Sequence, residues 1–356
     1  MLHRPFFDPH LSYEENYKKG PFGAFAEKNI FKNKGKPKFD FLGQKVFLPF
    51  GIPAGPLLNS KFTNAALDKG FDIVTYKTVR SKKYSSHSWP NVLSVKVHGK
   101  LTEKKAERGV IGHHSYSHPL SITNSFGVPS FDPDVWQKDL RKAVRHARKG
   151  QVVVGSFQGT VNSQHDNEKY LKDFILTARL MKETGVKIME VNLSCPNEGH
   201  GNLLCFDIER AKFIAFGIKN KIGNIPLIVK ISYFHNEERL GKFVYELGSI
   251  VDGIAAINTL PAKVIDEKNH QALPGEGRIK SGICGSAIQW AGLEMVKRLN
   301  KLRTELGLSF AIIGVGGVTE PKDYFEYRKL GADAIMSATG TMWNPFLAQQ
   351  IKKKVS

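Results

Sequence analysis

The stretch IMEVNLSCPN, residues 188–197, decides the fold, because a short apolar run passes directly into a polar turn. The run Ile188–Leu193 has the length and apolar character of a buried strand. The residues after it, Ser194 to Asn197, include a proline and belong to types that end a strand. A strand with polar side chains at its carboxyl end is typical of parallel α/β folds, whose active sites lie at that end.

Seven further apolar runs follow the same pattern along the chain. The eight runs are Val46–Pro53, Ile73–Lys77, Val152–Phe157, Ile188–Leu193, Leu227–Ile231, Ile254–Asn258, Phe310–Val315 and Ala334–Ser337. The amphipathic stretches between them include Gln137–Lys149, Asn167–Thr184, Asp207–Lys221, Glu237–Gly248, Ile288–Leu306 and Pro321–Leu330. Eight such units favour a closed barrel over an open doubly wound sheet, so the sequence predicts an α/β fold, a (β/α)8 TIM barrel.

Two long segments interrupt the regular spacing of the predicted units. They run from Arg80 to Asp134 and from Leu260 to Ser286, and each begins where a barrel strand would end. We therefore predict inserted loops at the C-terminal face of the barrel that cover the substrate. Residues 1–44 show no clear periodicity and are predicted to form an N-terminal arm. No repeat or linker divides residues 45–356, which we expect to be a single barrel domain.

The composition indicates a soluble globular protein, with 41% hydrophobic residues, 24% charged residues and a mean hydropathy of -0.28. Charges and prolines interrupt the first thirty residues, so they contain no signal-peptide core, and no run approaches the roughly 18 apolar residues of a membrane span. We expect a cytoplasmic location without stable membrane insertion. The three cysteines lack a C-x-x-C spacing, which excludes a disulfide framework and a self-contained four-cysteine cluster.

The net charge of +19 could attract phosphates, acidic lipids or anionic substrates. The basic residues are nevertheless spread over many short groups: Lys32 to Lys38, Arg80 to Lys83, Lys100 to Arg108, Arg141 to Lys149 and Lys352 to Lys354. This distribution favours a solvated basic surface over a dedicated patch, so we expect no nucleic-acid partner.

Lysines and glycines at the strand ends point to a bound anion. Lys77 ends the second run and Lys230 lies within the fifth, and a buried lysine is costly unless it meets a negative group. Each lysine alone could serve a structural ion pair, but two on one barrel favour an anionic cofactor. Residues 314–318 and 337–341 follow the seventh and eighth runs, where barrels of this class bind phosphate. Tight strand-to-helix turns are the alternative reading of these glycines.

Cys195 is the candidate catalytic residue, because it lies two residues beyond a strand end between two asparagines. A free cysteine most often serves as a small buried hydrophobe, but here the amide groups suggest a bound substrate with the thiol near a removable proton. Cys205 and Cys284 lack such neighbours and are expected to be structural. The histidine-rich stretch 112–118 matches no zinc spacing, so we predict a loop and no metal site.

Taken together, these motifs resemble the dihydroorotate dehydrogenase family over roughly residues 40 to 350. The most specific match is NLSCPN at 192–197, which is similar to the cysteine-bearing loop of the class 1 enzymes, whereas class 2 enzymes have serine there. NSFGVP at 124–129 resembles the substrate loop of the family. Further similar segments are YKT at 76–78, VK at 229–230, INT at 257–259, SGICG at 281–285 and IIGVGGV at 312–318.

The resemblance implies bound FMN and a small pyrimidine substrate, dihydroorotate or orotate. For the flavin it implies contacts from Ala54, Gly55, Lys77, Thr78, Asn192, Lys230, Ile257, Gly285, Gly316, Gly317, Ala338 and Thr339. For the substrate it implies contacts from Lys77, Asn124, Ser125, Phe126, Gly127, Val128, Asn192, Asn197, Asn258 and Thr259. Cys195 would remove the C5 proton of dihydroorotate while C6 delivers a hydride to flavin N5.

Several features differ from the class 1 pattern. Residues 198–205, after the cysteine loop, are closer to those of dihydropyrimidine dehydrogenases, the segment SATGT at 337–341 differs from the usual phosphate loop, and the arm is longer. The alternatives are therefore another pyrimidine-directed flavin barrel, similar to dihydropyrimidine dehydrogenase or to tRNA dihydrouridine synthase, or a non-catalytic basic barrel. The class 1 resemblance also implies a homodimer. The electron acceptor stays open between fumarate, NAD through a partner subunit, and quinone.

Overall fold

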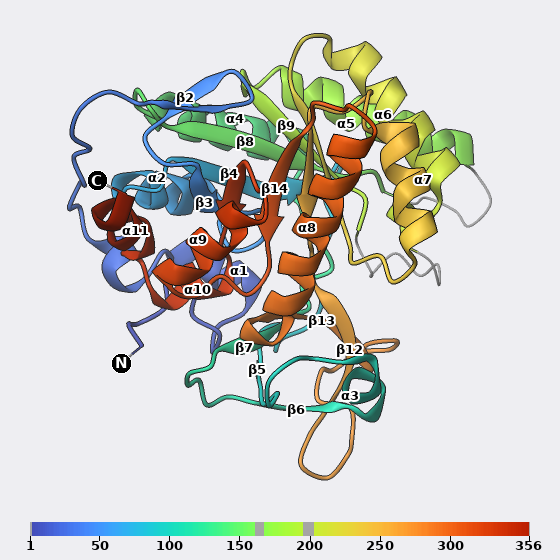
Figure 1. Cartoon of the computed structure of the whole chain (residues 1–356). Coiled ribbons are helices and arrows are strands. Elements are labelled where there is room, and N and C mark those ends of the chain that lie inside the picture. Colours follow the sequence, from blue (N-terminus) through green and yellow to red (C-terminus); the bar gives the residue numbers. More distant parts are fainter. Residues whose placement is uncertain (1, 161–166, 195–202, 356) are drawn as a thin grey trace.

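Eight parallel strands close into a barrel in the computed structural model, which describes residues 2–160, 167–194 and 203–355 (Figure 1). The strands follow one another in chain order, and the ring closes where the last pairs with the first. Each overlaps one predicted run, so the predicted (β/α)8 fold is confirmed. They are β3 (Phe50–Ile52), β4 (Ile73–Val79), β8 (Val152–Phe157), β9 (Ile188–Asn192), β10 (Leu227–Ile231), β11 (Gly253–Ala256), β14 (Ala311–Val315) and β15 (Ala334–Met336).

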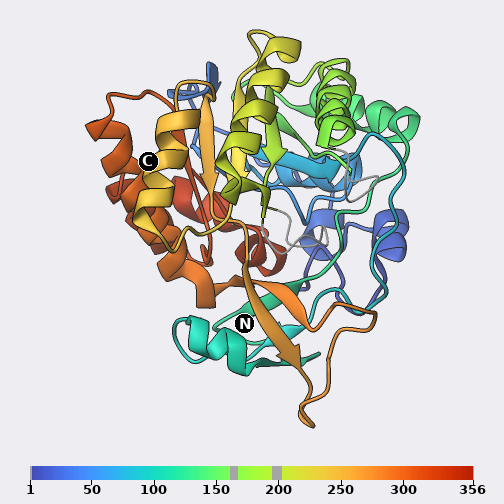
Figure 2. The ribbon, with the colours of Figure 1, turned by 90° about the vertical axis from the view of Figure 1, so that its right-hand side faces the viewer.

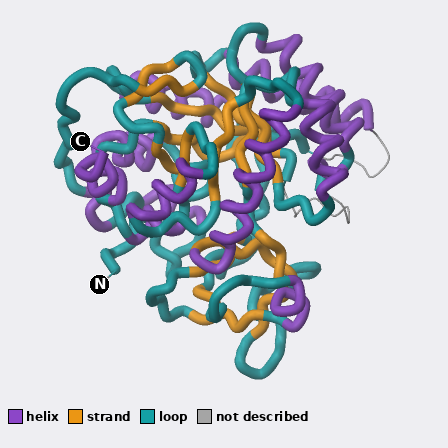
Figure 3. The backbone as a smooth tube through the Cα atoms, in the orientation of Figure 1, coloured by secondary structure: helices purple, strands orange, loops and turns teal. Residues whose placement is uncertain are grey.

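Helices surround the barrel strands, as Figure 3 shows. The six predicted helices are present as α4 (Pro133–His146), α5 (Asn167–Lys182), α6 (Ile208–Ile222), α7 (Glu237–Leu247), α8 (Gln289–Glu305) and α9 (Pro321–Lys329). Three shorter helices packed around the main barrel were not predicted: α2 (Ser60–Asp68), α10 (Thr339–Trp343) and α11 (Leu347–Val355). Among the described residues, no helix is long and apolar enough to cross a membrane.

The barrel interior is apolar at the amino ends of the strands and polar at their carboxyl ends. Ile73, Val152, Ile188 and Ile228 belong to one buried cluster inside the barrel. A hairpin of β1 (Phe39–Phe41) and β2 (Gln44–Val46) closes the amino end, because it adds apolar side chains to the same cluster. Side chains alternate along a strand, so the inward positions further along carry the polar groups: Lys77, Ser156, Glu190, Asn192 and Lys230.

The two insertions come together in a second, smaller barrel beside the main one (Figures 1 and 2). The first contributes β5 (Ser94–Val95), α3 (Glu103–Arg108), β6 (Val110–His113) and β7 (Ser121–Asn124), and the second contributes β12 (Leu260–Ile265) and β13 (Lys280–Gly285). Strand β13 pairs antiparallel with β7, and β12 pairs parallel with β6. The sequence predicted two separate covers and gave no sign of this pairing.

The N-terminal arm packs against the barrel through aromatic side chains. Phe6, Phe7, Tyr13 and Phe25 are buried, and the backbone N–H of Phe6 donates to the carbonyl oxygen of Met342 at 3.1 Å. The arm contains a helix, α1 (Tyr13–Lys19), and a short 3-10 helix, η1 (Gly23–Ala26), which the sequence analysis did not predict. A capping box begins α1, and the serine and glutamate three residues apart that form it were a readable signal.

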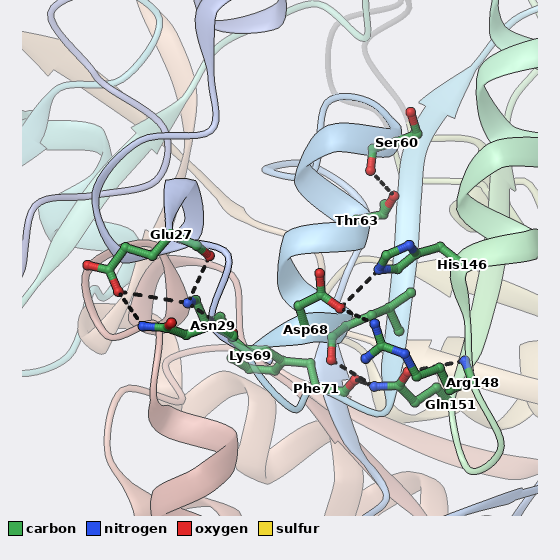
Figure 4. Close-up of polar contacts among 11 residues, drawn as sticks. Glu27, Asn29, Ser60, Thr63, Asp68, Lys69, Phe71, His146, Arg148 and Gln151 are labelled. Atoms are coloured by element: carbon green, nitrogen blue, oxygen red, sulfur yellow. Dashed lines mark hydrogen bonds and ion pairs between the residues drawn. The ribbon is translucent and has the colours of Figure 1, made fainter. Parts of the chain in front are cut away.

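A buried lysine at the end of α2 ties the arm to the barrel (Figure 4). Nζ of Lys69 donates to the carbonyl oxygens of Glu27 and Asn29, at 3.2 and 3.3 Å. On the other side of the helix, Asp68 accepts a 2.7 Å hydrogen bond from Arg148 and lies 3.0 Å from His146. The end of α2 therefore holds the arm on one side and the loop before β8 on the other.

Part of the positive charge does not face solvent: Lys353 and Lys354 are exposed as expected, but Lys352 is not. Lys352 is largely buried, and its Nζ lies 2.8 Å from Oδ1 of Asp72. Burial raises the pKa of Asp72 to about 6 and lowers the pKa of Lys352. Lys69, Lys77 and Lys230 are buried as well. The net charge of the chain consequently overstates the charge of its surface.

Candidate active site

Two adjoining cavities lie at the carboxyl ends of the barrel strands, where the small barrel and the arm cover them. Their empty volumes are about 750 and 600 Å³. They form one continuous site because they share several wall residues: Ala54, Gly55, Asn124, Phe126, Lys230, Asn258 and Thr259. The arm reaches the larger cavity through Phe7.

All residues predicted to contact a flavin line these cavities. The larger cavity is lined by Ala54, Gly55, Lys230, Ile257, Gly285, Gly316, Gly317, Ala338 and Thr339. The smaller cavity adds Lys77, Thr78 and Asn192. Strand ends that lie far apart in the sequence therefore meet in one place.

Most residues predicted to contact the substrate line the smaller cavity. They are Lys77, Asn124, Phe126, Gly127, Val128, Asn192, Asn258 and Thr259. Ser125 lines neither cavity; it is buried, and its Oγ accepts hydrogen bonds from Arg278. The structure therefore does not place this serine as a substrate ligand. Cys195 and Asn197 lie outside the described residues.

A chain of hydrogen bonds runs across three strands beneath the smaller cavity. Oγ of Ser156 donates to Oε1 of Glu190 at 3.0 Å. Because that bond uses the serine hydrogen, Thr78 is the donor in its 3.0 Å contact with Ser156. The second carboxylate oxygen of Glu190, Oε2, is buried and has no hydrogen-bond partner among the described residues. This carboxylate is therefore fixed on one side and open on the other.

Glu190 and Lys230 form a buried pair of opposite charges on adjacent strands. Both side chains are on the inward face, and both line the smaller cavity. Burial raises the pKa of Glu190 and lowers that of Lys230, and the attraction between the two groups opposes both shifts. The partner that a buried Lys230 requires is thus at least partly supplied by the protein.

The amide of Asn192 is oriented by its neighbours. Its Nδ2 donates to Oε1 of Gln158 at 2.7 Å, and its Oδ1 accepts from Oγ of Ser194 at 3.1 Å. Nδ2 of Asn258 donates to the same serine oxygen at 2.9 Å. Two site asparagines are therefore linked through Ser194, the residue that precedes Cys195.

Gly55 and Thr339 leave room and hydrogen-bonding capacity for a bound group. Gly55 has a φ of 142°, and a Cβ at this position would have no heavy atom within 4 Å. A side chain there would therefore enter the open space of both cavities. The hydroxyl of Thr339 is buried beside the thiol of Cys284, a weak partner, and has no stronger hydrogen-bond partner among the described residues. A ligand with acceptor oxygens, such as a phosphate ester, would satisfy it.

Glu190 and Cys284 are cavity residues that the sequence analysis missed. Cys284, expected to be structural, lines the larger cavity, and burial raises its pKa to about 11. Cys205 is fully buried, as a structural cysteine would be, and its pKa is raised to about 12. Glu190 could have been found, because it precedes Asn192 by two residues on a predicted strand and so shares its face.

The histidine-rich stretch belongs to the small barrel and lines neither cavity. His113 ends β6, and burial lowers its pKa. Within the part of the chain that the structure describes, no three His, Cys, Asp or Glu side chains are grouped as metal ligands would be.

Comparison with known proteins gives one consistent family. The family model for dihydroorotate dehydrogenase matches residues 38–356. A dihydroorotate dehydrogenase of Dictyostelium discoideum is 35% identical over 98% of this chain and 97% of its own length. The catalytic subunit of dihydroorotate dehydrogenase B (NAD(+)) from Oceanobacillus iheyensis is 33% identical over 65% of this chain and 70% of its own.

A solved structure supports the same fold at lower identity. The crystal structure of DHODH in complex with ferulenol from Eimeria tenella superimposes with a TM-score of 0.70 and 17% sequence identity, covering 92% of this chain and 86% of that one. This likeness supports the barrel architecture. The family model does not match the arm before residue 38. The alignment with the Dictyostelium enzyme covers 98% of the chain and so includes most of the arm.

Proposed function

The chain belongs to the dihydroorotate dehydrogenase family, and we propose that it oxidises dihydroorotate to orotate in pyrimidine biosynthesis with bound FMN and Cys195 as the base. One observation carries the proposal. Apart from Ser125, the described residues that the family motifs assign to flavin and pyrimidine line two cavities that share a wall. In this proposal residues 45–356 form the FMN-binding domain.

The larger cavity fits FMN in shape and in polarity. Its apolar walls and the open space at Gly55 suit a flat ring system, and the buried Thr339 hydroxyl, which has only a weak thiol partner, suits a phosphate. Lys230 supplies a positive charge on the wall common to both cavities. Bound FMN would supply the acceptor for the hydride from C6 of the substrate.

The smaller cavity would hold the pyrimidine through amides and a lysine. Asn124 and Asn258 lie on walls that face both cavities, and Asn192 is already oriented by Gln158 and Ser194. Amides of this kind can pair with the carbonyl and N–H groups of a pyrimidine ring. Lys77 would neutralise the negative charge that develops on the ring carbonyls. These side chains therefore bind and orient the substrate.

The proposed base follows directly after a residue whose hydroxyl is hydrogen-bonded on both sides. Ser194 accepts from Asn258 and donates to Asn192, and Cys195 is the next residue in the chain. A thiolate at position 195 would take the proton from C5 as the C6 hydride departs. The cysteine and the related B-type catalytic subunit support a class 1-like enzyme. A homodimer and a cytoplasmic location stay predictions from the sequence.

An anaerobic half-reaction tests the proposed function. The purified protein should carry FMN, and dihydroorotate should bleach its absorbance, whereas dihydrouracil and tRNA that contains dihydrouridine should not. Reoxidation of the reduced protein with fumarate, a quinone analogue, or NAD plus a partner subunit then identifies the acceptor. A protein that holds flavin but is bleached by one of the other two pyrimidines would be a different flavin barrel. A colourless protein that binds no FMN would overturn the proposal.

A further inference from the structure

The segment that would contact the pyrimidine from the small barrel, residues 124–128, is here called the substrate loop. Asn124, Phe126, Gly127 and Val128 line the smaller cavity, whereas Ser125 does not. The backbone N–H of Ser125 donates to the carbonyl oxygen of Asn91 at 3.1 Å. The serine therefore faces the protein, and its contacts lie behind the loop.

Behind the substrate loop lies Arg278, a residue of the second insertion whose side chain is only 6% exposed. Its Nε and Nη2 donate to Oγ of Ser125 at 3.2 and 3.0 Å, and Nη2 also lies 3.2 Å from the carbonyl oxygen of the same serine. A guanidinium offers its donors in a rigid fork, so contacts to both the hydroxyl and the carbonyl of one residue fix its position.

The remaining donors of Arg278 bind two other segments. Nη1 donates to the carbonyl oxygens of Ser88 and Pro274, and Nη2 reaches that of Pro90 at 3.1 Å. All five N–H groups of the side chain thus have acceptors. One side chain therefore joins the substrate loop, the segment 88–90 of the first insertion and the second insertion.

Aromatic contacts hold the opposite side of the substrate loop. The ring of Phe126 packs edge-on against Phe7 and Tyr13 of the arm, with centroids 5.4 and 5.8 Å apart. Gly127 has a φ of 77°, and a Cβ there would lie 2.6 Å from the ring of His87. These contacts act by packing. Nδ2 of Asn91 also donates to the carbonyl oxygen of Ser125 at 3.0 Å, whereas the hydroxyl of Ser125 is held by Arg278.

We propose that Arg278 is a positioning residue of the substrate site, which acts through Ser125 to hold the substrate loop against the pyrimidine. Its partners are carbonyl and hydroxyl oxygens, so the fork geometry of the guanidinium, more than its charge, holds the three segments together. This arrangement of Arg278 and its partners is called the clamp. The proposal rests on the proposed function for the identity of the substrate but not for the existence of the clamp.

The main test compares Arg278→Lys with the wild type. Lysine keeps the charge but cannot reach three segments, so the KM for dihydroorotate should rise about tenfold to a hundredfold, as expected for lost hydrogen bonds to a charged group, with kcat within about threefold. FMN content and the unfolding temperature show whether the variant is folded. Ser125→Ala removes the acceptor hydroxyl and leaves the arginine, so it should also raise the KM for dihydroorotate. This variant keeps the proposal testable if Arg278→Lys fails to fold.

Arg303→Lys is the matched control. Arg303 also donates to backbone carbonyls, those of Phe310 and Gly331, and lines neither cavity. Its substitution should lower the unfolding temperature without changing KM. A wild-type KM in Arg278→Lys would overturn the clamp, because charge alone would then suffice. So would additive effects of Arg278→Lys and Ser125→Ala in the double variant, because a shared interaction predicts non-additivity.

Hydrogen exchange separates this proposal from the proposed function. In the absence of any substrate, the amides of residues 124–128 should exchange faster in Arg278→Lys than in the wild type and in Arg303→Lys. If exchange is faster in the variant but the wild-type protein does not oxidise dihydroorotate, the clamp is supported and the proposed function is rejected. Unchanged exchange in an active enzyme would reject the clamp alone.

Discussion

Ser156 fixes Glu190 from a neighbouring strand, because its hydroxyl donates to Oε1 of the carboxylate at 3.0 Å. The other carboxylate oxygen has no hydrogen-bond partner among the described residues, and Lys230 lies within electrostatic reach. The positive charge of Lys230 lowers the pKa of this carboxylate and so offsets part of the cost of its burial. That relationship makes Glu190 a determinant of the charge at the cavity wall.

Glu190→Gln should weaken FMN binding at alkaline pH, because Lys230 then carries less positive charge in the variant than in the wild type. Burial already lowers the pKa of Lys230, and the carboxylate raises it. Without the carboxylate the lysine loses its proton at a lower pH, so FMN affinity should begin to fall at a lower pH than in the wild type. Fluorescence titration of the apoprotein with FMN between pH 6 and 10 measures this shift.

The buried pair Asp72 and Lys352 provides the control, because neither residue lines a cavity. Asp72→Asn should lower the unfolding temperature and leave the FMN affinity unchanged. If Glu190→Gln bound FMN like the wild type at every pH, Glu190 would have no part in setting the charge of Lys230.

Gly55→Ala should lower FMN affinity by at least tenfold while the protein stays folded. The added methyl group would stand in the space common to both cavities, and the φ of 142° adds strain of about 1–2 kcal/mol. FMN retention on gel filtration and the dissociation constant of the flavin measure the effect.

Gly43→Ala is the control that separates the effect of backbone strain from that of a methyl group in the flavin space. Gly43 has a φ of 81° in the turn between β1 and β2, and a Cβ there would also meet nothing within 4 Å. This variant should lose stability but bind FMN normally. Equal FMN affinities in the two alanine variants would show that the space at Gly55 is not where the flavin lies.

The barrel strands could be predicted because each is a local apolar run with polar residues at its end. Ile188 to Asn192 carries both signals within five residues, and the hydrophobic pattern alone specifies a buried strand. The same alternation places Lys230 and Asn192 side by side at the carboxyl ends, which is why most of the candidate site could be named from sequence.

The small barrel and the clamp could not be predicted, because they depend on pairings between distant segments. Strand β5 consists only of Ser94 and Val95, too short for any periodicity, and β7 pairs with a strand far along the chain. A motif also does not reveal which way each side chain faces. Ser125 stands between two cavity residues, and its contacts with Asn91 and with Arg278, 153 positions away, show that it faces the protein.

Iodoacetamide at pH 8 should modify Cys195 and leave the other two cysteines intact. Burial raises the pKa of Cys284 to about 11 and that of Cys205 to about 12, so only about one in a thousand and one in ten thousand of these thiols ionise at pH 8. Mass spectrometry of the digested protein locates the label, and bound orotate should slow its appearance. Faster labelling at Cys284 than at Cys195 would contradict both the proposed base and the raised pKa of Cys284.

Cys195→Ala should retain FMN, but dihydroorotate should reduce the bound flavin at least about a hundredfold more slowly than in the wild type, as expected when a general base is lost. Cys195→Ser should keep partial activity with its pH dependence moved to higher pH, because a hydroxyl is a far weaker acid than a thiol. Stopped-flow absorbance under anaerobic conditions gives the rate of flavin reduction for each variant from pH 6 to 10. Cys284→Ala is the matched control, since it removes the thiol that lines the larger cavity and should leave the pH profile in place. Normal flavin reduction in Cys195→Ala would move the base to another residue, and the loss of FMN from that variant would assign position 195 to cofactor binding instead.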